Sequence, residues 1–185
     1  MITVTELVDR IRQVDMHGLL DVKPSDNGDF LLVEFWRLGG AFRDDRSKKL
    51  TMVIDPAKEG LEGELFFYAP TLEKCKPKEL ALTMYMDADA RFFHGKHAWS
   101  ASEEDVFFAY AMPLPDDTAE FPSPALFERL LKDMYRGLLF REVKSFQLRI
   151  EDDDMLSEEE KTAKHEQVEA MIKRLTGPRV PTDGV

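Results

Sequence analysis

The chain has 185 residues, 43% of them hydrophobic, and a formal net charge of −11 at pH 7. This length fits one domain, which buries roughly 70% of its unfolded surface and needs no disulfide or metal for stability. The single cysteine excludes an intrachain disulfide, and the acidic charge argues against direct binding to nucleic acid or anionic lipid.

The first segment has the pattern of a helix and lacks that of a secretory leader. Its apolar residues recur at helical spacing and predict an amphipathic helix over residues 5–14. Thr3 and Glu6 have the spacing of a capping box. No basic start precedes an apolar core here, and no apolar run approaches the ~18 residues that span a bilayer. We therefore expect a cytoplasmic protein without a membrane segment.

Five segments rich in aromatic and β-branched residues predict strands. They are FLLVEFWRL (30–38), LTMVID (50–55), ELFFYAP (64–70), RFFHGKHAW (91–99) and DVFFAYAMPL (105–114). The turn-rich KPSDNGD precedes the first strand, and we expect a loop at 39–48 and a hairpin connection at SASEED (100–105).

Three further helices are predicted. Pro77 suits the first turn of a helix over 78–89, and Ser123-Pro124 gives a capping residue and a first-turn proline for a long one. We expect the long helix to cover the sheet with a broad, buried apolar stripe of Leu126, Phe127, Leu130, Leu131, Met134, Leu138 and Leu139. A last helix opens with a second capping box at Ser157 and Glu160 and ends before Gly177.

This element order predicts an α+β fold with a mostly antiparallel five-stranded sheet, helices packed on one face (α-β-β-β-α-β-β-α), and an appended C-terminal helix. We divide the chain into an α+β domain at 1–150 and an acidic linker, C-terminal helix and frayed tail at 151–185. The second part carries ten acidic and five basic residues.

Histidines and aspartates give weak signals for a metal site. His94 and His97 form an H-x-x-H pattern, but residues three apart on a strand point to opposite faces and do not chelate one ion. Asp152, Asp153 and Asp154 lack the spacing of a calcium loop. We predict no metal site.

Other chemical signals are equally weak. Glu103, Glu104 and Asp105 fall in the predicted hairpin turn, where exposed acids are ordinary. Cys75 has flanking lysines that lower a thiol pKa, yet no partner is placed beside it by sequence. Gly39-Gly40 is not followed by the residues of a phosphate-binding loop. We predict no catalytic residue, cofactor or bound metal.

The stretch from Lys78 to Phe146 resembles YbjN-like proteins and, in element order, type III secretion chaperones. The resemblance consists of a helix, an aromatic strand (ARFFHGKHAW), an acidic turn (ASEED), an apolar strand (VFFAYAMPL), and a long helix beginning SPALFERLLKDMY. The element order extends over residues 5–146. The last helix is an addition, and DDTAEFPSP replaces the usual glycine-rich approach to the long helix.

The resemblance implies a small, acidic, non-enzymatic homodimer that binds segments of partner proteins in a chaperone-like or regulatory role. Binding at a sheet edge is one physical route to such recognition. The alternative is a small enzyme or small-molecule-binding protein with a pocket between sheet and helices. The partner-binding residues, the dimer surface and the identity of the partner are not predictable from the sequence.

Overall fold

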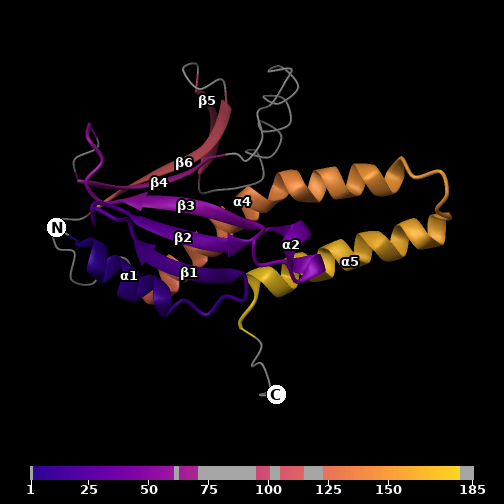
Figure 1. The fold of residues 1–185 in the computed structure, drawn as a ribbon, viewed down its shortest axis with the longest axis horizontal. Coiled ribbons are helices and arrows are strands. Elements are labelled where there is room, and N and C mark those ends of the chain that lie inside the picture. Colours follow the sequence, from indigo (N-terminus) through magenta and orange to yellow (C-terminus); the bar gives the residue numbers. More distant parts are fainter. Residues whose placement is uncertain (1, 61–62, 71–94, 101–104, 115–122, 180–185) are drawn as a thin grey trace.

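An open antiparallel sheet forms the centre of the computed structural model, which describes residues 2–60, 63–70, 95–100, 105–114 and 123–179 (Figure 1). The strands are β1 (Leu19–Pro24), β2 (Leu31–Trp36), β3 (Lys49–Asp55), β4 (Glu64–Pro70), β5 (Lys96–Ser100) and β6 (Asp105–Pro113). Their spatial order is β1-β2-β3-β4-β6-β5, with every neighbouring pair antiparallel. The α+β class and the antiparallel sheet are confirmed, with six strands in place of the predicted five.

The additional strand is β1, which precedes the KPSDNGD turn. Leu19 and Val22 are buried while Asp21 and Lys23 are exposed. This short run mixes polar and apolar residues and has a register irregularity after Leu19, so its strand signal is weak. Pairing with β2 along one side holds it in place.

A short helix, α2 (Leu38–Arg43), occupies the start of the segment predicted to be a loop. Gly39 and Gly40 make it a poor helix by local propensity. Its capping group comes from far along the chain, because the Leu38 backbone N–H donates to Glu142 Oε2 at 2.6 Å. Glu142 Oε1 also lies 2.6 Å from Arg37 Nε. A tertiary contact therefore stabilises this helix.

The N-terminal helix α1 (Val4–Arg12) confirms the predicted amphipathic segment. The capping box is present: Glu6 donates its backbone N–H to the Thr3 hydroxyl, and the Glu6 carboxylate accepts from the Thr3 backbone N–H. Leu7, Val8 and Ile11 are buried. They lie on the side of α1 that packs toward the sheet and the long helix.

The long helix α4 (Pro124–Glu151) begins at the predicted cap, where the Ser123 hydroxyl accepts from the Leu126 backbone N–H. Most of the predicted stripe is buried: Phe127, Leu130, Leu131, Met134 and Leu139, with Leu138 partly so. Leu126 is 45% exposed, so its assignment to the core was wrong. It lies five residues before Leu131, which is roughly 140° round the helix and at the margin of the buried face.

The predicted last helix is α5 (Glu158–Thr176), with its Ser157–Glu160 capping box. Its C-terminal end joins the core, since Gly18 donates its backbone N–H to Leu175 O at 2.7 Å and His17 to Gly177 O at 2.9 Å. Leu175 is fully buried. The division of the chain at residue 150 stays a prediction. The predicted helix at 78–89 lies outside the described residues, as do Arg91–His94.

Candidate binding face of the sheet

The two faces of the sheet have different neighbours. On the inner face, Phe67 and Phe35 contact α4, with ring centroids 6.4 Å from Phe127 and 4.8 Å from Tyr135. Alternation along β3 follows the same division, because Leu50, Met52 and Ile54 are buried while the residues between them are partly exposed. We call the opposite side the outer face.

A row of apolar residues crosses the outer face in register. Leu32 pairs with Val53, Val53 with Tyr68, and Tyr68 with Ala109, on strands β2, β3, β4 and β6. All four are partly exposed. Three strand spacings make the row roughly 14 Å wide. Such a width matches about four residues of an extended peptide.

Aromatic residues widen this row on β4 and β6. The Tyr68 ring lies 6.5 Å from that of Phe66 and 5.4 Å from that of Phe107, measured between centroids. Each ring has an alanine as its cross-strand partner: Ala111 beside Phe66, Ala109 beside Tyr68, and Ala98 beside Phe107. These eight residues form the aromatic band: Leu32, Val53, Phe66, Tyr68, Ala98, Phe107, Ala109 and Ala111. All of them are partly exposed.

An ion-pair network borders the aromatic band on β1, β2 and β3. Glu34 is only 8% exposed and lies between Lys23 Nζ at 3.1 Å and Lys49 Nζ at 2.6 Å. Burial raises the pKa of Glu34, but the hydrogen bonds from Lys49 and Lys23 outweigh burial and keep that pKa below its ordinary value. The carboxylate is therefore ionised and paired. It is better suited to linking β1, β2 and β3 than to acting as a general acid or base.

The exposed edge of β1 is partly closed to another strand. The Val22 carbonyl accepts from Arg12 Nη2 at 3.1 Å, and the Val22 N–H donates to Asp21 Oδ1 at 2.9 Å. Side chains thus occupy both backbone groups that an added strand would need at this position. These bonds argue against binding of a partner as an added strand along the β1 edge.

An open pocket of about 300 Å³ lies along the same edge, lined by Arg12, Leu19, Leu20, Asp21, Val22 and Arg179. The Arg12 guanidinium already bonds to the Val22 carbonyl, and the Arg179 backbone N–H donates to Asp15 Oδ1 at 2.8 Å. The pocket is open, and two of its titratable lining residues, Arg12 and Asp21, already bond to the Val22 backbone.

The structure separates the residues that the sequence singled out. His97 lies on β5 with its ring 5.2 Å from that of the inner-face residue Phe108, and His94, Glu103, Glu104 and Cys75 lie outside the described residues. Asp152 ends α4, and Asp153 accepts from the Met155 backbone N–H at 3.0 Å in the following turn. Asp105 begins β6, and Gly39-Gly40 lies in α2. Within the described ranges, no three His, Cys, Asp or Glu residues are grouped to hold a metal ion.

Sequence reasoning did not identify the aromatic band. The signal available was the nearly continuous apolar character of ELFFYAP and VFFAYAM, which supplies apolar side chains to both faces. Which residues share a face follows from the strand register, and the sequence does not give the register.

In the part of the chain that the structure describes, no helix has the length and apolarity to cross a membrane. No protein-family model, curated protein sequence or solved structure matches this chain.

Proposed function

We propose that the protein is a non-enzymatic, cytoplasmic protein-binding module with a chaperone-like or regulatory role, acting as a homodimer that holds a segment of a partner protein. The observation that carries this proposal is the aromatic band on the outer face. Partly exposed aromatic residues on a rigid sheet are the kind of surface that binds apolar side chains at low entropic cost.

The chemistry of the aromatic band favours an extended segment with alternate apolar side chains. Each large ring stands beside an alanine, so the surface offers recesses next to ridges. An extended segment projects every second side chain toward the surface it lies on, at a spacing of about 6.6 Å. Apolar residues at alternate positions of the partner would fill the recesses, and the Lys23–Glu34–Lys49 network would border the bound segment.

Among the residues that the structure describes, the small-molecule alternative has a candidate pocket beside Arg12 and Arg179. Its arginine on α1 bonds to the sheet backbone, and the open shape buries little of a ligand. The protein-binding proposal therefore has the stronger support.

The test is crosslinking of the full chain to captured cytosolic proteins, followed by mass spectrometry of the joined peptides. We expect crosslinks to extended apolar segments of a partner from Lys96, which pairs with Ala109 of the aromatic band, or from Lys49 of the bordering ion-pair network. Phe66→Ser should lower capture at least about tenfold. Leu126→Ser, which changes an exposed apolar residue on α4, is the matched control and should leave capture unchanged. Equal capture by both variants would exclude the aromatic band.

A further inference from the structure

The C-terminal half of α4 and the N-terminal half of α5 project together beyond the sheet as a helical hairpin (Figure 1). Contacts at its two ends show that the helices run antiparallel. Arg136 Nη2 donates to Thr176 Oγ1 at 3.4 Å near the core, and His165 Nε2 lies 2.6 Å from Glu151 Oε1 near the tip. We call residues 136–176 the arm. Its paired length on α4, from residue 136 to 151, is roughly 22 Å.

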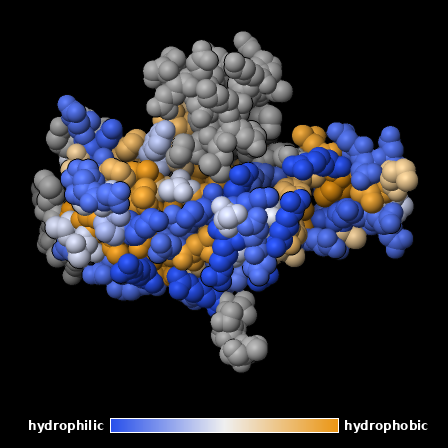
Figure 2. Space-filling model, viewed as in Figure 1, coloured by the Kyte–Doolittle hydropathy of each residue, from blue (hydrophilic) through white to orange (hydrophobic). Residues whose placement is uncertain are grey.

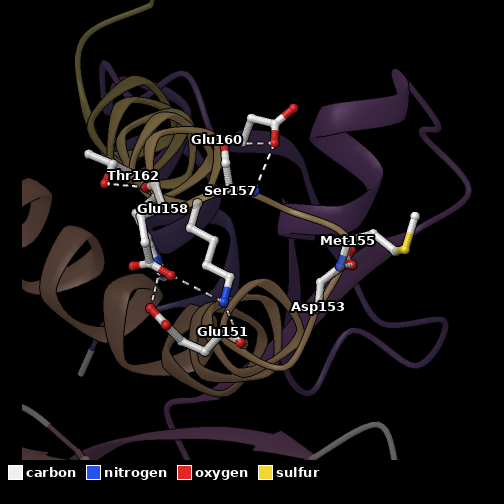
Figure 3. A network of polar contacts seen from close by, with 9 residues as sticks. Glu151, Asp153, Met155, Ser157, Glu158, Glu160 and Thr162 are labelled. Carbon is white, nitrogen blue, oxygen red and sulfur yellow. Dashed lines mark hydrogen bonds and ion pairs between the residues drawn. The ribbon is translucent and has the colours of Figure 1, made fainter.

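The turn at the tip of the arm is held by its own hydrogen bonds (Figure 3). Lys161 Nζ donates to the Glu151 carbonyl at 3.0 Å, and Ser157 and Glu160 cap the start of α5 reciprocally. These hydrogen bonds thus fix α5 to the end of α4 at the turn that joins the two helices. A rigid arm loses little conformational entropy when it binds another surface.

Exposed apolar residues gather at the arm. Four large hydrophobic residues are markedly exposed among the described residues, and three of them belong to the arm or its base: Leu148 at 55%, Met155 at 91% and Phe42 at 39%. Phe42 of α2 contacts Phe146 of α4, with ring centroids 5.7 Å apart. Figure 2 shows hydrophobic patches on the projecting arm amid hydrophilic surface. Single exposed apolar side chains are ordinary, whereas apolar side chains that gather on one part of a surface mark interaction sites.

Stretches of opposite charge lie on the two helices of the arm. Residues 136–149 of α4 contain four basic residues and one acid, which is Glu142, already paired with Arg37. Residues 158–169 of α5 contain five acids and two lysines. Lys173 and Arg174 follow on α5, so its acidic stretch is confined to residues 158–169. One copy therefore offers a basic stretch on α4 and an acidic stretch on α5.

We propose that the arm is the homodimer interface: two arms pack as a four-helix bundle in which α4 of each copy lies against α5 of the other. This inference rests on the homodimer in the proposed function and assigns its surface. Across a twofold axis, the basic stretch of each α4 lies against the acidic stretch of the other copy's α5. The same contact forms twice, so the surface is self-complementary. A foreign partner of one charge would complement only half of the arm. Leu148 and Phe42 become buried in the dimer.

The net charge of −11 on each copy opposes association only weakly at this distance. The Debye length is about 8 Å at physiological ionic strength, so local pairs across the interface outweigh the charge on remote parts of each copy. Dimerisation should consequently weaken as salt is raised.

The first test measures the solution mass of the full chain by light scattering and sedimentation. The wild-type chain should have twice the monomer mass of 21.3 kDa at micromolar concentration. Leu148→Glu should weaken the dimer at least about tenfold. Leu126→Glu is the matched control, because it changes an exposed leucine on the same helix away from the arm, and it should leave the dimer intact.

The second test uses charge reversal, which alters exposed residues and leaves the core alone. Arg149→Glu on α4 and Glu166→Lys combined with Glu159→Lys on α5 should each weaken the homodimer. Mixing the two variants should restore a dimer, because the mixed pair brings opposite charges together at both contacts. A dimer indifferent to all of these substitutions places the interface elsewhere and overturns this inference alone. A wild-type chain that stays monomeric at about 100 μM overturns the homodimer of the proposed function as well.

Discussion

The ring of Tyr135 packs against Gly18 so closely that a Cβ atom at position 18 would lie 2.4 Å from Tyr135 Cε1. The same Cβ would lie 2.7 Å from the carbonyl oxygen of Leu175. The Tyr135 hydroxyl donates to the Trp36 carbonyl at 2.6 Å, and its ring stacks on Phe35. Burial raises the pKa of Tyr135, so the hydroxyl stays a donor at any physiological pH. At this point α4, α5 and the first two strands meet.

Gly18→Ala should destabilise the protein by about 1–3 kcal/mol, the usual cost of overpacking a close-packed site. Neither a buried aromatic ring nor a helix-end carbonyl moves aside easily. Gly39→Ala is the control with the opposite sign, because its Cβ would lie 3.8 Å from the Phe146 ring. Alanine in place of this helical glycine should stabilise by about 0.5–1 kcal/mol. Chemical denaturation of both variants checks the pair, and equal midpoints would contradict the close packing at Gly18.

Glu142→Ala should cost about 1–3 kcal/mol, because Leu38 N–H loses its acceptor and Arg37 its partner. Glu142→Gln should cost less, since the amide oxygen still accepts one of the two bonds. The control is Glu128→Ala, which removes the partner of Lys132 on the surface of the same helix and should cost under about 0.5 kcal/mol. Hydrogen exchange adds a local measurement: only the Glu142 variants should speed exchange of the Ala41 amide in α2.

Local signals were enough to predict several elements. Thr3, Ser123 and Ser157 marked three helix starts within one turn, because capping needs only a residue and its neighbours three positions on. By contrast, α2 depends on Glu142, which is 104 residues from Leu38. No local pattern encodes such a contact.

The candidate site shows the same limit. The sequence supplied the aromatic residues of β4 and β6, but the aromatic band exists because Tyr68 pairs with Val53 and Ala109 on two different strands. The five-strand prediction likewise missed β1, whose place at the edge is set by pairing with β2. Both the aromatic band and β1 depend on how strands pair in the folded chain, which the strand propensity of the residues does not specify.

Acidification should destabilise the protein through His17. Burial, together with the nearby positive charge of Arg174, holds the pKa of His17 below its ordinary value of 6.5. The unfolded chain then binds a proton more readily than the folded one, so stability falls as pH falls from 6.5 through the folded pKa. The carboxylate of Glu34 has a lowered pKa too, and its contribution is lost at lower pH, below its ordinary value of 4.5.

Melting temperatures of the wild type and His17→Gln between pH 7.5 and 5 isolate the histidine. Glutamine does not titrate, and the backbone bond from residue 17 to the Gly177 carbonyl is kept. The wild type should lose more stability than the variant over this range. Parallel curves would show that His17 protonates equally in both states.

The stability of the fold should depend most on the apolar face of α4, and three substitutions along this helix test that expectation. Leu130 is 2% exposed, so Leu130→Ala should cost on the order of 2–5 kcal/mol. Leu126→Ala removes the same atoms from a side chain that is 45% exposed, and should cost under about 0.5 kcal/mol. Ser123→Ala removes the cap that accepts from the Leu126 N–H and should cost ~1 kcal/mol. Denaturation midpoints should therefore fall most for Leu130→Ala, less for Ser123→Ala and least for Leu126→Ala. If Leu130→Ala left the midpoint unchanged but abolished dimerisation, the stripe would be an interface and the close contact of α4 with the inner face would not be the source of stability.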